Sequence, residues 1–419
     1  MMGMRWRNLM TACASTTLLV CLSCGPSPSV VRIQITPADG AFDDSLAVTL
    51  TGLPAQATVS ISADTVDYRG HPWQSVAQYT SDGTGRLDLT RVRPIGGSYD
   101  VAAGAGLIWS LAPTRDSDRK DGYFPPASGM AIHLEVRVSG SVVASGTARR
   151  SWGRGVRRVE LRPPTDRLYG NYFAPASTHA PGPAILWLGG SGPGLADPVV
   201  SSLMAAHGIS TLSLAYFGVP GLPTALQEIP LEYFAAAIGW LQRQPGVDPH
   251  GIWIMGMSRG SEAALLTAAH YSSLVHGVVV LAPSGISNCS EVDCGASWSL
   301  GGLPLPFTQD FGNPNPDNTA AVIPVERIEG PILLICGGAD QVWPSCGYAV
   351  AIDKRLALSG FAHEHRVLRY PLAGHALADP APNLPEYQYL EQMRGVLPWS
   401  NALARMSAWP AILEFVRSA

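Results

Sequence analysis

The pattern of hydrophobic and polar residues changes once along the chain, near residue 158. Before this point, short segments alternate between apolar and polar residues and are separated by glycine-rich turn sequences such as residues 81–85. Alternation with a period of two is typical of strands that bury one face, so this region predicts a β-sandwich. The strands that we expect here are residues 31–35, 46–51, 58–63, 75–80 and 133–138.

After residue 158, apolar runs of strand length alternate with longer segments of helical periodicity. Nearly continuous apolar runs are typical of parallel strands that are covered on both faces, and the alternation predicts an α/β domain with right-handed crossovers. The expected strands are residues 184–188, 209–214, 252–255, 275–281 and 332–336. The expected helices are residues 225–241, 261–270 and 348–358. Residues 283–324 interrupt the alternation and predict an insertion near the mouth of the site.

The N-terminus has the pattern of a secretory signal. Arg5 and Arg7 precede the apolar residues 18–22, which are too few for a transmembrane helix, and Ser23-Cys24-Gly25 follows. This ending resembles the lipobox of bacterial lipoproteins with Cys24 as the lipidated residue, although Cys21 stands where that motif normally has Leu. We therefore expect export to the periplasm or cell surface and a membrane tether through Cys24. The predicted organisation is a signal peptide (1–24), a linker (25–30), a β domain (31–158) and an α/β domain (159–419).

Composition narrows the class of protein. Hydrophobic residues make up 46% of the chain and charged residues 14%, which is enough apolar material for a core. The net charge of −4 leaves no basic surface for nucleic acid.

Outside the signal region there are four cysteines, an even number that permits two disulfides in an exported protein. They are Cys289, Cys294, Cys336 and Cys346. The short separation favours Cys289 with Cys294, and buried free thiols are the alternative. These cysteines form no Cys-x-x-Cys motif and have no histidine at ligand spacing, so they do not predict a metal site. We expect no cofactor.

The candidate nucleophile lies in Gly256-x-Ser258-x-Gly260. The predicted strand 252–255 runs directly into this pentapeptide, and the helical run 261–266 follows it. A serine in a tight strand–turn–helix of this kind is the nucleophile elbow of an α/β-hydrolase. The two glycines are expected because the turn leaves no room for a Cβ atom at either position.

A serine hydroxyl needs a general base, and the base needs an acid that orients it. In this fold the chain order is Ser, then Asp or Glu, then His. Asp340 follows the predicted strand 332–336 through a flexible turn, and His375 follows the strand-like residues 366–370 in Ala373-Gly374-His375. We therefore predict Ser258, Asp340 and His375 as the catalytic residues.

An oxyanion would need two backbone N–H donors. One is expected from Arg259, where the helix begins. The other is expected from Gly190 or Ser191, in the glycine-rich loop after the first core strand, and the sequence does not decide between them. A nucleotide-binding loop is the rival interpretation, but this stretch lacks the Lys-Ser/Thr of a P-loop and the spacing of a dinucleotide fingerprint.

At these residues the sequence resembles the acyl-CoA thioesterase / bile acid-CoA:amino acid N-acyltransferase family. Beside the Ser258, Asp340 and His375 motifs, the resembling segments include Trp73-Gln74-Ser75, Gly106-Leu107-Ile108-Trp109-Ser110-Leu111 and Leu231-Glu232-Tyr233-Phe234. The resemblance implies an immunoglobulin-like N-terminal domain on an α/β-hydrolase. It also implies cleavage of acyl-CoA thioesters, or acyl transfer to an amino acid, through a covalent acyl-enzyme. Transferases of the family typically have Cys as nucleophile and thioesterases Ser, so Ser258 favours hydrolysis.

The function that we expect is hydrolysis of an acyl thioester through a covalent acyl-Ser258 intermediate, and the expected partner is a small-molecule acyl thioester or ester. The alternatives are a carboxylesterase or dienelactone-hydrolase-like enzyme, and an acyl-CoA:amino acid N-acyltransferase. A non-catalytic surface binding protein is disfavoured, because it has no reason to keep Ser258, Asp340 and His375 at the ends of three strands. Coenzyme A should be scarce outside the cytoplasm, so the expected export leaves the natural acyl donor open.

Overall fold

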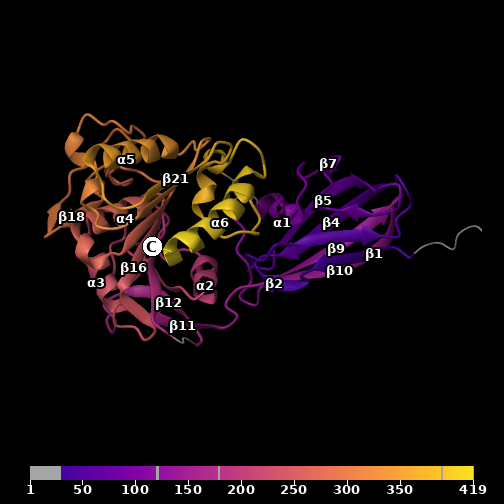
Figure 1. The fold of residues 1–419 in the computed structure, drawn as a ribbon, viewed down its shortest axis with the longest axis horizontal. Helices are drawn as coiled ribbons and strands as arrows, with labels where there is room; N and C mark the ends of the chain where they lie inside the picture. Colours follow the sequence, from indigo (N-terminus) through magenta and orange to yellow (C-terminus); the bar gives the residue numbers. More distant parts are fainter. Residues whose placement is uncertain (1–29, 119–121, 178–179, 388–389, 419) are drawn as a thin grey trace, which may run out of the picture.

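The computed structural model describes residues 30–118, 122–177, 180–387 and 390–418. A β-rich part, indigo to purple in Figure 1, lies beside a larger α/β part. The predicted signal peptide, its lipidation residue Cys24 and nearly all of the predicted linker lie outside the described residues. Within the described ranges, no helix is both long enough and apolar enough to cross a membrane.

Two sheets make up the N-terminal part. The smaller sheet is antiparallel and contains, in spatial order, β1 (Arg32–Thr36), β3 (Ala47–Thr51) and β6 (Leu87–Asp88). The larger sheet contains, in spatial order, β2 (Asp39–Ala41), β10 (Ser141–Ser151), β9 (Met130–Val138), β4 (Thr58–Val66), β5 (Pro72–Thr80) and β7 (Gly96–Gly97), with β8 (Ala112–Pro113) also paired to β5. Every second residue along β5 is buried, as the alternating pattern predicts. Val48 of β3 and Ile61 of β4 belong to one buried cluster, so the two sheets share a core.

Each strand that we predicted in this region overlaps an observed one, but β10 was not predicted. Its sequence contains three Ser, two Ala and two Arg and lacks the apolar alternation that marks a half-buried strand. The pairing of β10 along β9 supplies the order that its own sequence does not indicate. One turn of helix, α1 (Gly106–Trp109), and the 3₁₀ turn η1 (Asp116–Asp118) complete this part.

An eight-stranded sheet forms the centre of the C-terminal part. Its spatial order is β11 (Val156–Leu161), β12 (Tyr169–Pro175), β14 (Ser210–Ala215), β13 (Gly182–Leu188), β16 (Val247–Met257), β17 (Gly277–Leu281), β20 (Ile332–Gly337) and β21 (His365–Tyr370). The β11–β12 and β12–β14 pairs are antiparallel and all others are parallel. The expected boundary between residues 158 and 159 therefore falls inside β11, and the α/β part begins at Val156.

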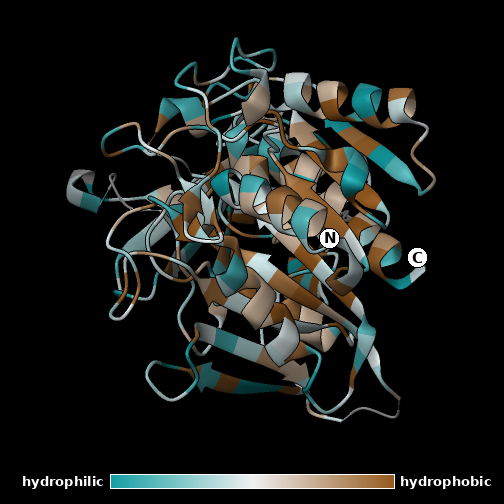
Figure 2. Cartoon of the chain, turned by 90° about the vertical axis from the view of Figure 1, so that its left-hand side faces the viewer, coloured by the Kyte–Doolittle hydropathy of each residue, from teal (hydrophilic) through white to brown (hydrophobic). Residues whose placement is uncertain are grey.

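Helices cover both faces of this sheet. They are α2 (Pro198–Ala206), α3 (Leu231–Leu241), α4 (Arg259–His270), α5 (Ser345–Ser359) and α6 (Ser400–Ser418). Successive strand residues point to opposite faces: Ile254 joins a buried cluster with α3, α4 and α5, and Met255 joins another with α2 and α6. In Figure 1, α2 and α6 lie on the side nearer the β domain and α3, α4 and α5 on the far side. Hydrophobic stretches gather along the central sheet in Figure 2, because its middle strands are wholly buried.

Short elements connect the main ones. A small sheet contains β15 (Ile229–Pro230), β18 (Trp298–Leu300) and β19 (Leu303–Pro304). The 3₁₀ turns are η2 (Ser272–Leu274), η3 (Thr319–Ala321), η4 (Val325–Arg327), η5 (His375–Ala378) and η6 (Glu391–Met393). Helix α3 begins six residues later than the predicted helix 225–241, because Pro230 lies in extended backbone immediately before it. Residues 283–324 hold only short elements, as expected for an insertion.

Asn383 makes three side-chain hydrogen bonds between the two parts. Its side chain is buried, its Nδ2 donates to the carbonyl oxygens of Phe42 (2.7 Å) and Asp44 (2.9 Å), and its Oδ1 accepts from the indole N–H of Trp109 (3.3 Å). The backbone of Asn383 has φ +55°, in the left-handed region that asparagine tolerates better than most residues. One side chain therefore joins α1 and the loop after β2 to the α/β part.

We predict that Asn383→Gly and Asn383→Ala both lower the free energy of unfolding, by about 2–3 kcal/mol, because each removes three hydrogen bonds and leaves buried partners unpaired. Asn383→Ala should cost about 1 kcal/mol more than Asn383→Gly, because only the glycine relieves the left-handed backbone. Urea unfolding followed by tryptophan fluorescence measures both values. Equal free energies of unfolding for the wild type and both variants would contradict the role of Asn383 as a stabilising contact between the two parts.

Candidate active site

Ser258 lies at a sharp turn between β16 and α4. Strand β16 ends at Met257, α4 begins at Arg259, and Ser258 between them has φ +51° and ψ −125°. Its N–H donates to the carbonyl oxygen of Leu281 (3.0 Å) and its carbonyl oxygen accepts from the N–H of Ser261 (2.8 Å). A left-handed conformation at a non-glycine residue costs about 1–3 kcal/mol and persists where the surroundings enforce it. The turn has the geometry of a nucleophile elbow.

The two glycines of the pentapeptide are required by close backbone contacts. A Cβ on Gly256 would lie 2.2 Å from the carbonyl oxygen of Gly260, and a Cβ on Gly260 would lie 2.2 Å from that of Gly189. Neither backbone atom can move without displacing β13 or α4. The glycines therefore let strand, turn and helix approach closely enough to present Ser258 at the sheet edge.

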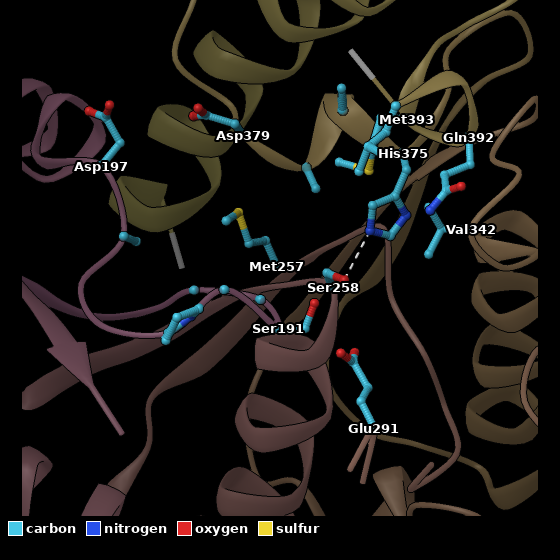
Figure 3. Close-up of a pocket in the computed structure, with 18 of the residues that line it drawn as sticks. Ser191, Asp197, Met257, Ser258, Glu291, Val342, His375, Asp379, Gln392 and Met393 are labelled. Carbon is cyan, nitrogen blue, oxygen red and sulfur yellow. Dashed lines mark hydrogen bonds between the residues drawn. The ribbon is translucent and has the colours of Figure 1, made fainter. Parts of the chain in front are cut away.

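The structure brings Asp340 and His375 to Ser258. His375 Nε2 lies 2.9 Å from Ser258 Oγ, and His375 Nδ1 lies 2.8 Å from Asp340 Oδ2 (Figure 3 shows the first of these bonds). The side chains of His375 and Asp340 are only 4% and 0% exposed. The backbone N–H groups of Val342 (3.0 Å) and Trp343 (3.3 Å) donate to the other oxygen of Asp340. The carboxylate is thus fixed from both sides and orients the imidazole toward the serine.

Trp343 belongs to the same arrangement, although sequence reasoning did not single it out. Its ring packs edge-on against the imidazole of His375 with centroids 5.6 Å apart, and its Nε1–H donates to the carbonyl oxygen of Ala282 (3.1 Å). Its buried ring restricts the rotation of His375. An aromatic residue three positions after the predicted acid was the only indication in the sequence.

The predicted oxyanion donors lie on the two sides of Ser258. Arg259 is the first residue of α4, so its N–H has no acceptor within the helix. The loop that carries Gly190 and Ser191 contacts the serine, because a Cβ on Gly190 would lie 3.1 Å from Ser258 Cβ. The hydroxyl of Tyr216 lies 2.6 Å and 2.7 Å from the carbonyl oxygens of Gly189 and Gly190 and holds the loop in place. The N–H of Gly190 shares a peptide unit with the carbonyl of Gly189, and the N–H of Ser191 shares one with the carbonyl of Gly190. In a trans peptide the N–H and the carbonyl point in opposite directions, so both N–H groups point away from Tyr216 and both remain candidate oxyanion donors.

The guanidinium of Arg259 has a separate, structural environment. It is 1% exposed and donates to Glu262 Oε1 (3.0 Å) and to the carbonyl oxygens of Asn288 (3.0 Å) and Cys289 (3.1 Å). Glu262 also accepts from Asn288 Nδ2 (2.8 Å) and Trp298 Nε1 (3.0 Å), and burial raises its pKa. This network fastens the insertion to α4 and leaves only the backbone N–H of Arg259 at the site.

The four candidate cysteines form two disulfides, Cys289–Cys294 and Cys336–Cys346. The first closes the loop that contains Glu291, which lines the cleft, and the second spans the segment that contains Asp340. Each disulfide therefore closes a segment that contributes a residue to the site. Across the described ranges, no group of three or more His, Cys, Asp or Glu residues has an arrangement that could hold a metal ion.

Ser258 and His375 open into a cleft of about 1000 Å³. Its polar wall contains the carboxyl groups of Asp197, Glu291 and Asp379, and Figure 3 places them around the serine and histidine. Its apolar lining includes Phe124, Leu195, Met257, Phe311, Leu390 and Met393. The cleft is large enough for an extended acyl chain and its leaving group. Phe124 comes from the N-terminal part, so both parts of the chain form the wall.

Asp197 and Asp379 form a pair of protonatable groups in this wall. Burial, and then the nearby carboxyl of Asp379, raise the pKa of Asp197 to about 7. Burial also raises the pKa of Asp379, against the opposing charge of Arg405. Two carboxyl groups so placed cannot both ionise without cost, so the pair holds a proton at near-neutral pH.

We predict that Asp197→Asn stabilises the protein at about pH 8 and has little effect at about pH 4. The folded chain keeps a proton on Asp197 that the unfolded chain has released, so wild-type stability falls as the pH rises from about 4 to about 7. The asparagine keeps an acceptor for the N–H of Val199 at the start of α2, which Asp197 Oδ1 now binds at 2.7 Å. Thermal unfolding over this pH range provides the measurement, and a stability gain of equal size at both ends would contradict the raised pKa.

The comparisons with known proteins agree along most of the chain. A family model described as "Acyl-CoA thioester hydrolase/BAAT N-terminal region" matches residues 43–163. A second model, "BAAT / Acyl-CoA thioester hydrolase C terminal", matches residues 229–295 and 305–419. Acyl-coenzyme A thioesterase 1 of Rattus norvegicus is 30% identical over 368 residues, which are 83% of this chain and 86% of the relative. Acyl-coenzyme A amino acid N-acyltransferase 2 of Mus musculus is 29% identical over 374 residues, covering 84% of this chain and 87% of the relative.

Among solved structures, a putative dienelactone hydrolase from Klebsiella pneumoniae overlaps 63% of this chain and 98% of its own, with 15% identity and a TM-score of 0.44. The family assignment rests on the sequence matches, which extend through both parts of the chain and include the segments around Ser258, Asp340 and His375. The resemblance seen in the sequence is thereby confirmed, and the chain belongs to the acyl-CoA thioester hydrolase/BAAT family.

Proposed function

We propose that this protein is a serine thioesterase that cleaves a small-molecule acyl thioester through a covalent acyl-Ser258 intermediate. The observation that carries the proposal is the hydrogen-bonded series Asp340–His375–Ser258 at the base of the cleft. The names of the relatives, acyl-coenzyme A thioesterases above all, support a thioester as the bond that is attacked.

The geometry supports a two-step reaction. His375 Nε2 accepts the proton of Ser258 as Oγ attacks the acyl carbon, and Asp340 stabilises the imidazolium that forms. The N–H of Arg259, with that of Gly190 or Ser191, would stabilise the oxyanion. The thiolate then leaves with the proton from His375. In the second step His375 activates a water that releases the acid and regenerates Ser258.

Hydrolysis requires that water, and no amine, accepts the acyl group. The serine nucleophile favours this outcome, because the resemblance to the family associates transfer to amino acids with a cysteine. The oxygen ester of acyl-Ser258 is also less reactive toward amines than a thioester, which leaves water with its assisting base as the acceptor.

We also propose that the N-terminal part is an immunoglobulin-like sandwich that ends before β11, and that the chain is exported and tethered through lipidated Cys24. The two sheets with a common core support the first statement. The two disulfides support the second statement, because disulfides persist in oxidising compartments.

The reaction is tested by measuring hydrolysis of acyl-CoAs of graded chain length beside p-nitrophenyl esters. Ser258→Ala should lower kcat/KM for thioesters by about 1000-fold or more, because it removes the nucleophile while the fold is kept. Wild-type enzyme quenched during turnover should gain the mass of the acyl group, and Ser258→Ala should not. Ester turnover without thioester turnover would favour the carboxylesterase alternative. An amide product in the presence of glycine would favour the transferase.

Export is tested by expressing the full chain in a bacterium and measuring the intact mass from the membrane fraction. We expect a mature protein that begins at Cys24 and carries acyl chains, and we expect Cys24→Ala to be released from membranes. A soluble wild-type protein without lipid would exclude the tether, and cytoplasmic retention would exclude export.

A further inference from the structure

The segment that carries His375 is buried although it contains no regular strand or long helix. Every residue from 373 to 386 is buried except Asp379, which is half-buried. Segments between regular elements usually run over the surface, because their backbone groups otherwise need partners. The position of His375 therefore depends on the groups that bind this segment from outside.

Asn401 binds the backbone one residue before His375. Its Oδ1 accepts the N–H of Gly374 at 2.7 Å, its side chain is fully buried, and it is the second residue of α6. Gly374 fits tightly at this place, because a Cβ there would lie 1.9 Å from the carbonyl oxygen of Arg394. Asn401 thus holds the Ala373–Gly374 peptide, one residue before His375, together with the backbone at residue 394 and the N–H of Ala339, which donates to the carbonyl oxygen of Ala373 (2.9 Å).

Asn401 is in turn held by Glu386. The carboxylate of Glu386 accepts the backbone N–H groups of Asn401 (3.0 Å) and Ala402 (2.6 Å), which begin α6 and have no acceptor within the helix. The N–H of Glu386 donates to the carbonyl oxygen of Trp109 (2.8 Å), in α1 of the N-terminal part. A continuous series of hydrogen bonds therefore runs from Trp109 through Glu386 and Asn401 to Gly374.

We propose that Asn401 is a positioning residue for His375, through which the N-terminal part holds the general base in place for the reaction. The inference rests on the proposed function. Asn401 does not itself line the cleft; its Nδ2 donates to the carbonyl oxygen of Met393 (3.4 Å), which does, and its Oδ1 acts on His375 through the N–H of Gly374. A displacement of about 1 Å between reacting groups can cost about 100-fold in rate, so one bond next to His375 is enough to matter.

A second cavity makes this residue suitable for a test. It has a volume of about 520 Å³ and lies where the two parts meet, with Trp109, Glu386 and Asn401 in its lining. Truncation of Asn401 lets water from this cavity reach the Gly374 N–H, so the fold should survive. A mobile water does not fix the peptide as a buried side-chain oxygen does. The imidazole of His375 should therefore no longer be held in one position.

The experiment compares Asn401→Ala and Asn401→Asp with the wild-type enzyme. For Asn401→Ala we expect kcat to fall by about 10- to 100-fold with KM changed by less than about threefold. We also expect the far-downfield proton resonance of the His375–Asp340 hydrogen bond to broaden or vanish. Asn401→Asp keeps an acceptor for Gly374 and should recover most of the rate and the resonance.

Asn171→Ala is the matched control. Asn171 is also a buried asparagine, on β12, and its Oδ1 accepts from Arg162 (3.2 Å) far along the sheet from His375. The Asn171→Ala variant should be less stable than the wild type but should keep its kcat and the downfield resonance of the His375–Asp340 hydrogen bond. A wild-type kcat and resonance in Asn401→Ala, or equal losses in Asn171→Ala, would overturn the positioning role.

The proposed function fails by a different result. A wild-type protein without thioester turnover, or Ser258→Ala with full turnover, would end the assignment as a serine thioesterase. The resonance of His375 does not require turnover, so it tests the positioning by Asn401 in either case.

Discussion

The left-handed backbone of Ser258 is the constraint on which the rest of the site depends. That conformation is held because Ser258 donates to Leu281 in β17 and accepts from Ser261 in α4, while two glycines let the chain turn without a clash. Strand β16 lies between β13 and β17 in the middle of the sheet, so the hydroxyl emerges where several parallel strands end. A base and an acid can reach it only from loops at that edge, and an oxyanion donor only from the loop after β13.

This geometry explains why so much of the site was predictable. In a parallel sheet the carboxyl ends of the strands meet at one edge, so residues that follow separate apolar runs are placed together by topology alone. Ser258 follows β16, Asp340 follows β20 and His375 follows β21. The sequence identified β16 and β20 because each contains an uninterrupted apolar run, whereas β21, a partly exposed edge strand that contains His and Arg, was recognised only as the strand-like residues 366–370. Chain order then assigned a role to each residue.

What escaped prediction has a common physical origin. Helices α2 and α6 were not predicted: α2 is short and buried nearly all round, and Pro410 lies inside α6. Trp343, Asn383 and Asn401 act through contacts with segments distant in the chain, and no local pattern marks such pairs. Tertiary packing decides these positions, whereas periodicity and turn chemistry decide the elements that were predicted.

The N-terminal part contacts the segments of the α/β part that form the active site. In a fold of this kind the loop after the last strand carries the base, and a loop with few partners would let the base move. Here the loop after β21 is buried: Asn383 and Glu386 bind backbone groups of the β domain, while Phe124 of that domain reaches the cleft wall. The buried cluster on the α2–α6 face also continues into the core of the β sheets. The enzyme therefore needs both parts to hold one histidine, which gives a physical reason for family matches that extend over both parts of the chain.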